Sequence, residues 1–202
     1  MFFGYKFLDV QIASEKEKIM NGPQAEITIF DFKKPEELRR WVTMDDRVMG
    51  GASKSCLGHS EKGDVRFRGN VRLNERNLGF ASVRSKNSEF DLKTFEGVRI
   101  RVKGDGKIYR LNMKTEKHHD GFLYQHDFHS GDGGWMEHSI PFEAFLPFFR
   151  GKHAKDAPPL DPGSIKSFGL MVVGQEGDFE LDIEHIKAYG KSRTPELSPF
   201  SS

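Results

Sequence analysis

The sequence predicts an all-β fold, a two-sheet sandwich or jelly roll with short peripheral helices, and three observations support this. About ten short segments alternate apolar and polar residues, which is the two-residue period of half-buried strands. Turn clusters rich in Gly and Asp, such as Gly131–Gly134, separate these segments. Only short stretches carry helical signals, and no repeat with a period of about 20 to 50 residues marks a solenoid or a propeller.

The first strand is predicted at residues 26–32, where apolar side chains alternate with polar ones and the phase changes once, at Phe30. Pro35 then opens a short helix over Glu36–Trp41, because proline is favoured in the first turn of a helix and acidic residues follow it. Two strands with alternating apolar residues come next: Val65–Leu73 and Phe80–Val83.

Apolar residues alternate again over Val98–Val102 and over Tyr109–Met113. The tripeptide Gly104–Gly106 between them predicts a tight hairpin, because glycine adopts the positive φ angles that such turns require. The polar, proline-containing segment 150–163 is expected to be a surface loop. The remaining strands are predicted at Phe122–Phe128, Trp135–Ile140, Phe168–Val173 and Phe179–Ile186.

Length and composition favour one domain. The 202 residues contain no long Gly/Ser-rich or Pro-rich linker, and 36% hydrophobic with 30% charged residues is a globular balance. The 18 Phe residues supply a core large enough to fold without disulfides. We therefore expect an N-terminal arm over 1–25 with a short helix at Ile12–Met20, a jelly-roll domain over 26–190, and an extended tail over 191–202.

The single cysteine and the balanced charge limit which cellular compartments and which classes of partner fit this chain. Cys56 has no partner for a disulfide, which fits a reducing or matrix-like compartment, and we expect its thiol to be semi-buried. The formal net charge is +1, so no overall field draws the chain to nucleic acid or to an anionic membrane. No apolar run approaches the roughly 20 residues of a membrane-spanning helix, and no signal or transit peptide is visible. We expect a soluble chain.

Basic residues occupy the solvent-facing positions of three predicted strands, and a shared sheet would gather them on one face. One interpretation is a docking surface for an acidic protein segment, a phosphate-bearing ligand or RNA. The other is cross-strand pairing with the acids of the last strand, Glu180, Asp182 and Glu184. RNA is disfavoured, because most aromatic residues fall at core positions. The basic residues are Arg66, Arg68, Arg72, Arg99, Arg101, Lys103, Arg110 and Lys114.

No motif for catalysis or for a cofactor is present. The sequence has no Gly-x-Ser-x-Gly elbow, Walker loop, dinucleotide fingerprint or His-Glu-x-x-His helix. His118–Asp120 and His126–His129 suggest a metal site with Asp127 or Asp132. However, adjacent strand residues point to opposite faces, and no second cluster has the spacing of a zinc site. We therefore expect no catalytic residue, no cofactor and no metal site, and a function in binding.

Two stretches are unusual for a generic sandwich. Trp41–Ser53 contains twin glycines suited to a sharp turn, and Gly133–Phe145 joins a glycine turn to an Ile-Pro-Phe segment. Both resemble the complex I intermediate-associated protein 30 family, whose pattern has a Trp and then an Asp/Ser-rich segment leading into Gly-Gly-x-Ser, here Gly50–Ser53. The resemblance runs from about residue 27 to 199 and includes, in order, Val98–Gly106, Trp135–Phe145, Arg150–Gly151, Ile165–Gly169 and Pro195–Pro199.

The resemblance implies a galactose-binding-like jelly roll, similar to carbohydrate-binding modules, and no enzyme activity. It further implies a chaperone for the membrane arm of NADH:ubiquinone oxidoreductase in the mitochondrial matrix, associated with the inner membrane. Its partners would be membrane-arm assembly intermediates and other complex I assembly factors. Other family branches are bacterial or chloroplast proteins, some tied to RNA or photosystem biogenesis. A carbohydrate- or RNA-binding module is the alternative, the carbohydrate case resting on fold-level analogy alone.

The resemblance supplies no list of binding residues, so the candidate site rests on the charge pattern and on the loop that precedes the twin glycines. We expect partner binding at the basic face together with three residues of that loop. These candidates are Asp45, Asp46, Arg47, Arg66, Arg68, Arg99, Arg101 and Arg110.

Overall fold

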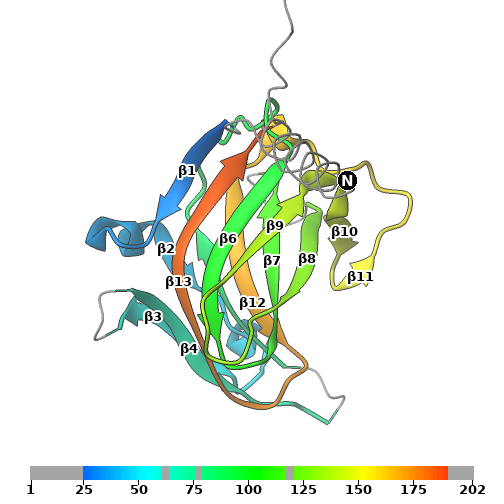
Figure 1. The fold of residues 1–202 in the computed structure, drawn as a ribbon. Coiled ribbons are helices and arrows are strands. Elements are labelled where there is room, and N and C mark those ends of the chain that lie inside the picture. Colours follow the sequence, from blue (N-terminus) through cyan, green and yellow to red (C-terminus); the bar gives the residue numbers. More distant parts are fainter. Residues whose placement is uncertain (1–24, 61–63, 76–78, 117–120, 191–202) are drawn as a thin grey trace, which may run out of the picture.

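The computed structural model of this protein describes residues 25–60, 64–75, 79–116 and 121–190. In this part of the chain, thirteen strands form two antiparallel sheets that face each other (Figure 1). The predicted arm before residue 25, its helix over Ile12–Met20 and the predicted tail over 191–202 lie outside the described residues. The domain boundaries 26–190 stay a prediction.

The sheets differ in size. Sheet A has six strands, in the order β3 (Lys54–His59), β4 (Val65–Val71), β13 (Gly177–Tyr189), β6 (Gly97–Gly104) and β9 (Met136–Pro141), with β1 (Glu26–Asp31) also paired to β13. Sheet B has seven, in the order β11 (Lys152–His153), β10 (Leu146–Phe149), β8 (Leu123–His129), β7 (Ile108–Lys114), β12 (Ser167–Val173), β5 (Phe80–Ser85) and β2 (Trp41–Thr43). Figure 1 shows β6, β9 and β13 in front of β7 and β12.

The helices of the described segments are short 3-10 turns at the periphery, as predicted. They are η1 (Pro35–Arg40), η2 (Asp46–Met49), η3 (Phe142–Ala144) and η4 (Pro162–Ser164). Pro35 does open η1, but the turn ends one residue before the predicted end, because the buried Trp41 begins strand β2. None of these helices is long and apolar enough to cross a membrane.

The phase change predicted at Phe30 is confirmed as an irregularity in β1. The register of β1 against β13 shifts between Thr28 and Phe30, as at a β-bulge. The shift turns both Ile29 and Phe30 toward the interior, where their side chains are 9% and 0% exposed. An unbroken two-residue period would have left one of them facing solvent.

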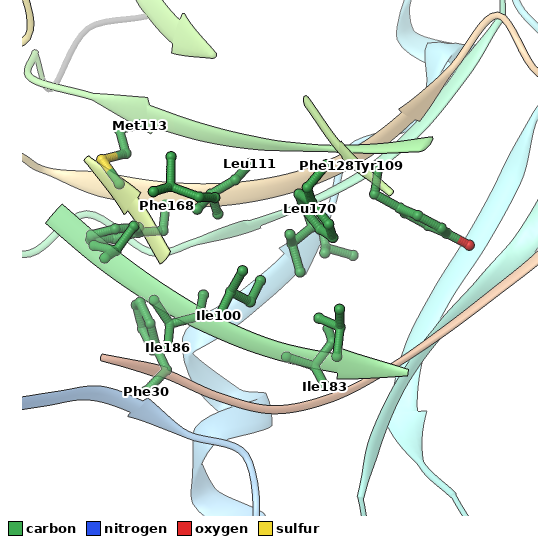
Figure 2. Packing of buried hydrophobic residues seen from close by; sticks show 14 of the residues in the cluster. Phe30, Ile100, Tyr109, Leu111, Met113, Phe128, Phe168, Leu170, Ile183 and Ile186 are labelled. Atoms are coloured by element: carbon green, nitrogen blue, oxygen red, sulfur yellow. The ribbon is translucent and has the colours of Figure 1, made fainter. Parts of the chain in front are cut away.

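The core lies between the two sheets and follows the alternation that the sequence shows. Figure 2 shows Phe30, Ile100 and Ile183 of sheet A directed toward side chains of sheet B such as Leu111 and Leu170. All five are fully buried. The predicted strands therefore present their apolar phase to one shared interior.

One prediction of connectivity is wrong. Gly104–Gly106 does not close a hairpin, because β6 belongs to sheet A and β7 to sheet B. β6 pairs with β13 and β9, whereas β7 pairs with β8 and β12. The tripeptide instead carries the chain from one layer to the other. Alternating patterns alone do not distinguish the two cases, because both put the apolar residues of each strand into the same core.

Asp105 holds this crossover together. Its carboxylate accepts hydrogen bonds from the Tyr109 hydroxyl at 3.1 Å, the Glu180 backbone N–H at 3.0 Å and the Lys107 backbone N–H at 3.2 Å. It thereby connects β7 of sheet B to β13 of sheet A. Burial, with the nearby Asp105 carboxylate, raises the pKa of Tyr109 above its ordinary range, so this phenol remains a hydrogen-bond donor.

Candidate functional site

The structure divides the predicted basic residues between two faces. Arg66 and Arg68 on β4, and Arg99 and Arg101 on β6, lie on the outer face of sheet A, between core positions such as Phe67. Arg110 lies on β7 in sheet B, where its guanidinium binds Asp127. The three basic strands therefore do not share a sheet, and Arg110 is not part of the face that the other four form.

Strand β13 runs between β4 and β6 and places its acids among these arginines. Arg101 Nε lies 2.5 Å from Glu184 Oε2. Arg99 pairs with Glu26 of β1 and stacks over the Tyr189 ring at 4.9 Å. Cross-strand pairing with the acids of the last strand, one of the two interpretations of the charge pattern, is thus confirmed for Arg101 and also for Arg66.

Arg66 takes two acids at once, and this leaves an excess of positive charge beside it. Its guanidinium binds Asp182 through Nε at 2.6 Å and Nη2 at 3.0 Å, and Nη1 lies 2.8 Å from Glu180. By register, Glu180 faces Arg68 and Asp182 faces Lys103. Among the described residues, neither Arg68 nor Lys103 forms an ion pair, because Arg66 engages the acids opposite them.

These unpaired cations line two adjoining hollows on the outer face of sheet A. One hollow has a volume of about 370 Å³ and is lined by Arg66, Arg68, Lys103 and the edge strand β3. The other has a volume of about 690 Å³ and reaches Lys54, which also has no ion-pair partner in the described segments. Both hollows include Cys56 and Arg68 in their walls. Four acids also line these hollows, and each is engaged within the fold: Glu180 and Asp182 by Arg66, Asp178 by Asn70, and Asp105 at the crossover. We call this surface the basic hollow, defined by Lys54, Cys56, Arg66, Arg68 and Lys103.

The expectation of a semi-buried Cys56 thiol is wrong. The thiol is exposed rather than semi-buried, because Cys56 faces Arg68 across the β3–β4 pair, on the outer side of sheet A. The neighbouring Leu57 carries the inward phase and packs on the core. Strand β3 was not predicted from the sequence, since its alternation is weak.

Asp45 and Asp46 form a structural corner at one end of β2. Asp46 is 6% exposed and accepts hydrogen bonds from the Ser53 backbone N–H at 3.0 Å, the Ser53 hydroxyl at 2.7 Å and the Phe80 backbone N–H at 3.1 Å. Asp45 accepts from the Ser55 and Ser82 backbone N–H groups and from the Ser55 hydroxyl. The donors of the chain itself thus occupy both carboxylates. Partner binding by these two residues stays a prediction.

Arg47, the third predicted loop residue, is exposed within η2. The turn ends at Gly50 with φ +82°, a conformation that favours glycine. A Cβ on the next residue, Gly51, would lie 2.2 Å from Asp46 Cγ. The twin glycines of the sequence are therefore explained by one left-handed residue and one close approach to a buried carboxylate.

The outer face of sheet B carries polar residues that the sequence did not single out. Arg84, Asn112 and Gln125 lie in one register row across β5, β7 and β8, with Gly169 of β12 between Arg84 and Asn112. Asn112 and Gln125 are only 5% and 8% exposed, although they point away from the core. No sequence signal distinguished these positions, since isolated Asn and Gln in strands look like ordinary solvent-facing residues.

The described histidines that suggested a metal site bind separate backbone groups and do not converge on one point. His126 Nδ1 lies 3.2 Å from the Ala144 carbonyl oxygen, and His129 Nδ1 accepts from the Gly131 backbone N–H at 3.1 Å. Asp127 is paired with Arg110. Within the described ranges, no group of three His, Cys, Asp or Glu side chains is placed to hold a metal ion. His118–Asp120 lies outside these ranges.

His138 is an inward-facing histidine, opposite the buried Ile100 and beside the Phe128 ring. Its Nε2 is buried without a hydrogen-bond partner in the described part of the chain. Burial, assisted by the neighbouring His126 and His129, lowers the pKa of His138 below its ordinary value of 6.5. The fold therefore favours the neutral ring.

This burial predicts a loss of stability in acid. Because the pKa of His138 is lower in the folded state, unfolding takes up a proton, and stability falls as the pH drops below about 6.5. We expect His138→Phe to show a smaller loss of the urea midpoint between pH 7.5 and 5.5 than the unsubstituted protein. His59→Gln, at an exposed histidine, is the control and should keep the full loss. Equal losses in all three proteins would contradict the assignment.

Comparison with protein families supports the resemblance seen in the sequence. A family model described as complex I intermediate-associated protein 30 matches residues 30–183. A Drosophila melanogaster protein named complex I intermediate-associated protein 30, mitochondrial, is 26% identical over 180 residues, or 78% of this chain. The Mus musculus protein of the same name is 22% identical over 200 residues, or 85% of this chain. Both matches span 61% of the relative's length.

A Schizosaccharomyces pombe protein described only as uncharacterized is 31% identical over 171 residues, which is 74% of this chain and 77% of that protein. Among solved structures, the family 11 carbohydrate-binding module of the Clostridium thermocellum cellulase Lic26A-Cel5E is similar, with a TM-score of 0.62 and 17% identity over 82% of this chain and 95% of the module. The agarase AgWH50C has a TM-score of 0.57 and 11% identity over 83% of this chain and 25% of the agarase.

The structural similarities bear on the fold alone, because their sequence identities are low. Together with the two antiparallel sheets, they confirm the predicted galactose-binding-like jelly-roll β-sandwich with short peripheral helices. They carry no information about which ligand this chain binds.

Proposed function

The chain belongs to the complex I intermediate-associated protein 30 family, and from this membership we propose that it is a non-catalytic assembly factor for respiratory complex I. The observation that carries the proposal is the family match over residues 30–183, which covers almost all of both sheets. Two relatives with this family name are also named mitochondrial. We place the protein in the mitochondrial matrix, in peripheral contact with the inner membrane.

The proposed partners are assembly intermediates of the membrane arm and other complex I assembly factors, bound through the basic hollow. Arg68, Lys103 and Lys54 supply positive charge that the described residues do not neutralise. An acidic protein segment would supply the missing counter-charges, and such an interaction weakens as salt rises. The pairing of Arg66, Arg99 and Arg101 within the fold leaves little of the basic face for RNA.

The test is a rescue experiment in the source cell. Deleting the gene should lower the amount of mature complex I and change the pattern of membrane-arm intermediates on native gels, and the unsubstituted gene should restore both. We expect the double variant Arg68→Glu/Lys103→Glu to fold but to rescue poorly. The matched control is Lys34→Glu/Lys93→Glu, which makes the same charge change at exposed lysines outside the hollow.

Two results would contradict the proposal, one its assembly role and the other its binding surface. Unchanged complex I and unchanged intermediates after deletion would remove the assembly role. Full rescue by Arg68→Glu/Lys103→Glu would keep that role but remove the basic hollow from it. Circular dichroism of both purified double variants would show whether each is folded.

A further inference from the structure

Sheet B has an outer face that does not behave as a solvated surface. In a two-layer sandwich, side chains that point away from the core normally lie in water. On β7, β8 and β12, however, four outward-facing polar residues are at least nine-tenths buried. They are Asn112, Lys114, Gln125 and Ser167, with exposures of 5%, 6%, 8% and 1%.

Two of these side chains lack the hydrogen bonds that burial normally requires. Asn112 Oδ1 and Ser167 Oγ are buried and have no hydrogen-bond partner in the described structure. A buried polar atom left unpaired opposes folding, and native proteins leave few of them. The two residues lie on the adjacent strands β7 and β12, since Ser167 faces Lys114 across the pair and Asn112 is two positions before Lys114. The unsatisfied atoms therefore belong to one patch.

Arg84 adds an uncompensated charge to the same patch. Its guanidinium forms no ion pair with the described residues, and burial lowers its pKa. The contrast with Arg110, one row further along the sheet, is clear: Arg110 binds the Asp127 carboxylate and the Gln125 amide oxygen. Gly169, which faces both Arg84 and Asn112, has no side chain to fill the space between them.

The ends of the row are apolar. The register row runs Val42, Arg84, Gly169, Asn112, Gln125 and Leu146 across six neighbouring strands. Val42 and Leu146 are 44% and 49% exposed. With neighbouring strands about 4.8 Å apart, the row is about 24 Å long. The patch therefore combines a polar, positively charged centre with apolar ends.

We propose that the outer face of β5, β12, β7 and β8 is a second binding surface, which docks an extended polypeptide segment that carries a carboxylate side chain. The backbone N–H groups of such a segment supply the donor that Asn112 Oδ1 lacks. Its carboxylate pairs with Arg84, and its apolar side chains cover Val42 and Leu146. A phosphate group offers chiefly acceptors and leaves Asn112 Oδ1 unpaired, and a neutral glycan leaves Arg84 without a counter-charge.

The first test separates a binding role from a structural one by thermal unfolding of the free protein. Because the Ser167 hydroxyl is unsatisfied without its ligand, Ser167→Ala should raise the Tm, by about 2–4 °C for a domain of this size. The control is Ser139→Ala on the outer face of sheet A, where the hydroxyl accepts a hydrogen bond from Arg99 and no rise is expected. An unchanged or lower Tm for Ser167→Ala would mean that the fold or a bound water satisfies the hydroxyl, and this would overturn the proposal.

The second test identifies the occupant. A photo-reactive residue, p-benzoylphenylalanine, is introduced at Val42 or Leu146 in the full chain in cells, and cross-linked peptides are sequenced by mass spectrometry. We expect both positions to cross-link to one polypeptide segment that contains Asp or Glu. Arg84→Glu should reduce the yield at least about tenfold, which corresponds to the loss of one good charged contact. The same probe at Met136, which is 40% exposed on sheet A, is the control and should not capture that segment.

Absence of a cross-link above the Met136 control, or a cross-linked segment without an acidic residue, would overturn the proposal. The inference rests on the proposed function only in taking the partner to be a protein. Failure of this inference can be distinguished from failure of the proposed function. If only the inference fails, the cross-links are absent but complex I assembly still depends on the gene. If only the proposed function fails, the cross-links at Val42 and Leu146 form, but deletion of the gene leaves complex I unchanged.

Discussion

Phe30→Ala should lower the free energy of unfolding by about 3–5 kcal/mol, the range for removal of a fully buried aromatic side chain. Phe30 is 0% exposed and lies at the centre of an aromatic cluster. Its ring centroid is 4.9 Å from that of Trp41, 5.6 Å from Phe168 and 5.8 Å from Phe90. Trp41 and Phe168 belong to two strands of sheet B, and Phe90 belongs to the segment between β5 and β6. Because the neighbours come from three separate segments, little of the cavity can close by the movement of one side chain.

The measurement is urea unfolding followed by circular dichroism, with the change read from the midpoint at constant slope. Phe149→Ala is the matched control, because Phe149 is 39% exposed on β10, next to the edge strand β11, and its removal leaves no closed cavity. We expect less than about 1 kcal/mol for this variant. If Phe30→Ala lowered the free energy of unfolding no more than Phe149→Ala, the result would contradict the packing of β1 against β2 and β12.

The two-sheet architecture was predictable because its signal is local. Apolar side chains recur every second residue in β4, β6, β7 and β13, and each such strand presents that set to the core. Even the bulge in β1 was visible, since it appears in the sequence as a change of phase at Phe30. Strands β2, β3, β10 and β11 were missed, because they are short or are stabilised by pairing with neighbours rather than by their own pattern.

The pairing of strands was not predictable, and the candidate site depends on it. The basic residues of β4 and β6 were visible, but their neutralisation depends on β13 lying between them, although β13 begins only at Gly177, far beyond the end of β6 at Gly104. The sequence likewise could not show that Arg66 would engage both Glu180 and Asp182. The unpaired state of Arg68 and Lys103 is a property of the register, which a one-residue slip would change.

The polar row of sheet B was hidden for a different reason. Asn112, Gln125 and Ser167 occupy solvent-facing phases, where polar residues are the rule. Only their burial and the absence of hydrogen-bond partners make them unusual, and both depend on the three-dimensional surroundings. Neither burial nor hydrogen bonding can be derived from the residue types alone.

Asp46→Ala should lower the free energy of unfolding by at least about 3 kcal/mol, because three hydrogen bonds to one buried carboxylate are lost together. The substitution removes a buried carboxylate that accepts from the backbone N–H groups of Ser53 and Phe80 and from the Ser53 hydroxyl. Hydrogen bonds to a charged group contribute about 1.5–3 kcal/mol each, and buried donors left without an acceptor add a desolvation cost. Ser53 is 0% exposed, so water does not readily replace the lost acceptor.

Gly51→Ala tests the same corner from the other side, because its Cβ would lie 2.2 Å from Asp46 Cγ and displace the carboxylate. We expect a loss similar to that of Asp46→Ala, and a double variant whose loss is smaller than the sum, since both changes break one set of contacts. Asp178→Ala, which removes one exposed hydrogen bond from Asn70, is the control and should cost less than about 1 kcal/mol.

These stability values also decide how a partner-binding defect at Asp46 is to be interpreted. A loss of partner binding by Asp46→Ala that Gly51→Ala reproduces would come from the disturbed corner. Binding lost only in Asp46→Ala, at a temperature where both variants remain folded, would show that the carboxylate itself contacts a partner. Losses that simply add in the double variant would contradict the shared network, because contacts that depend on one carboxylate can be lost only once.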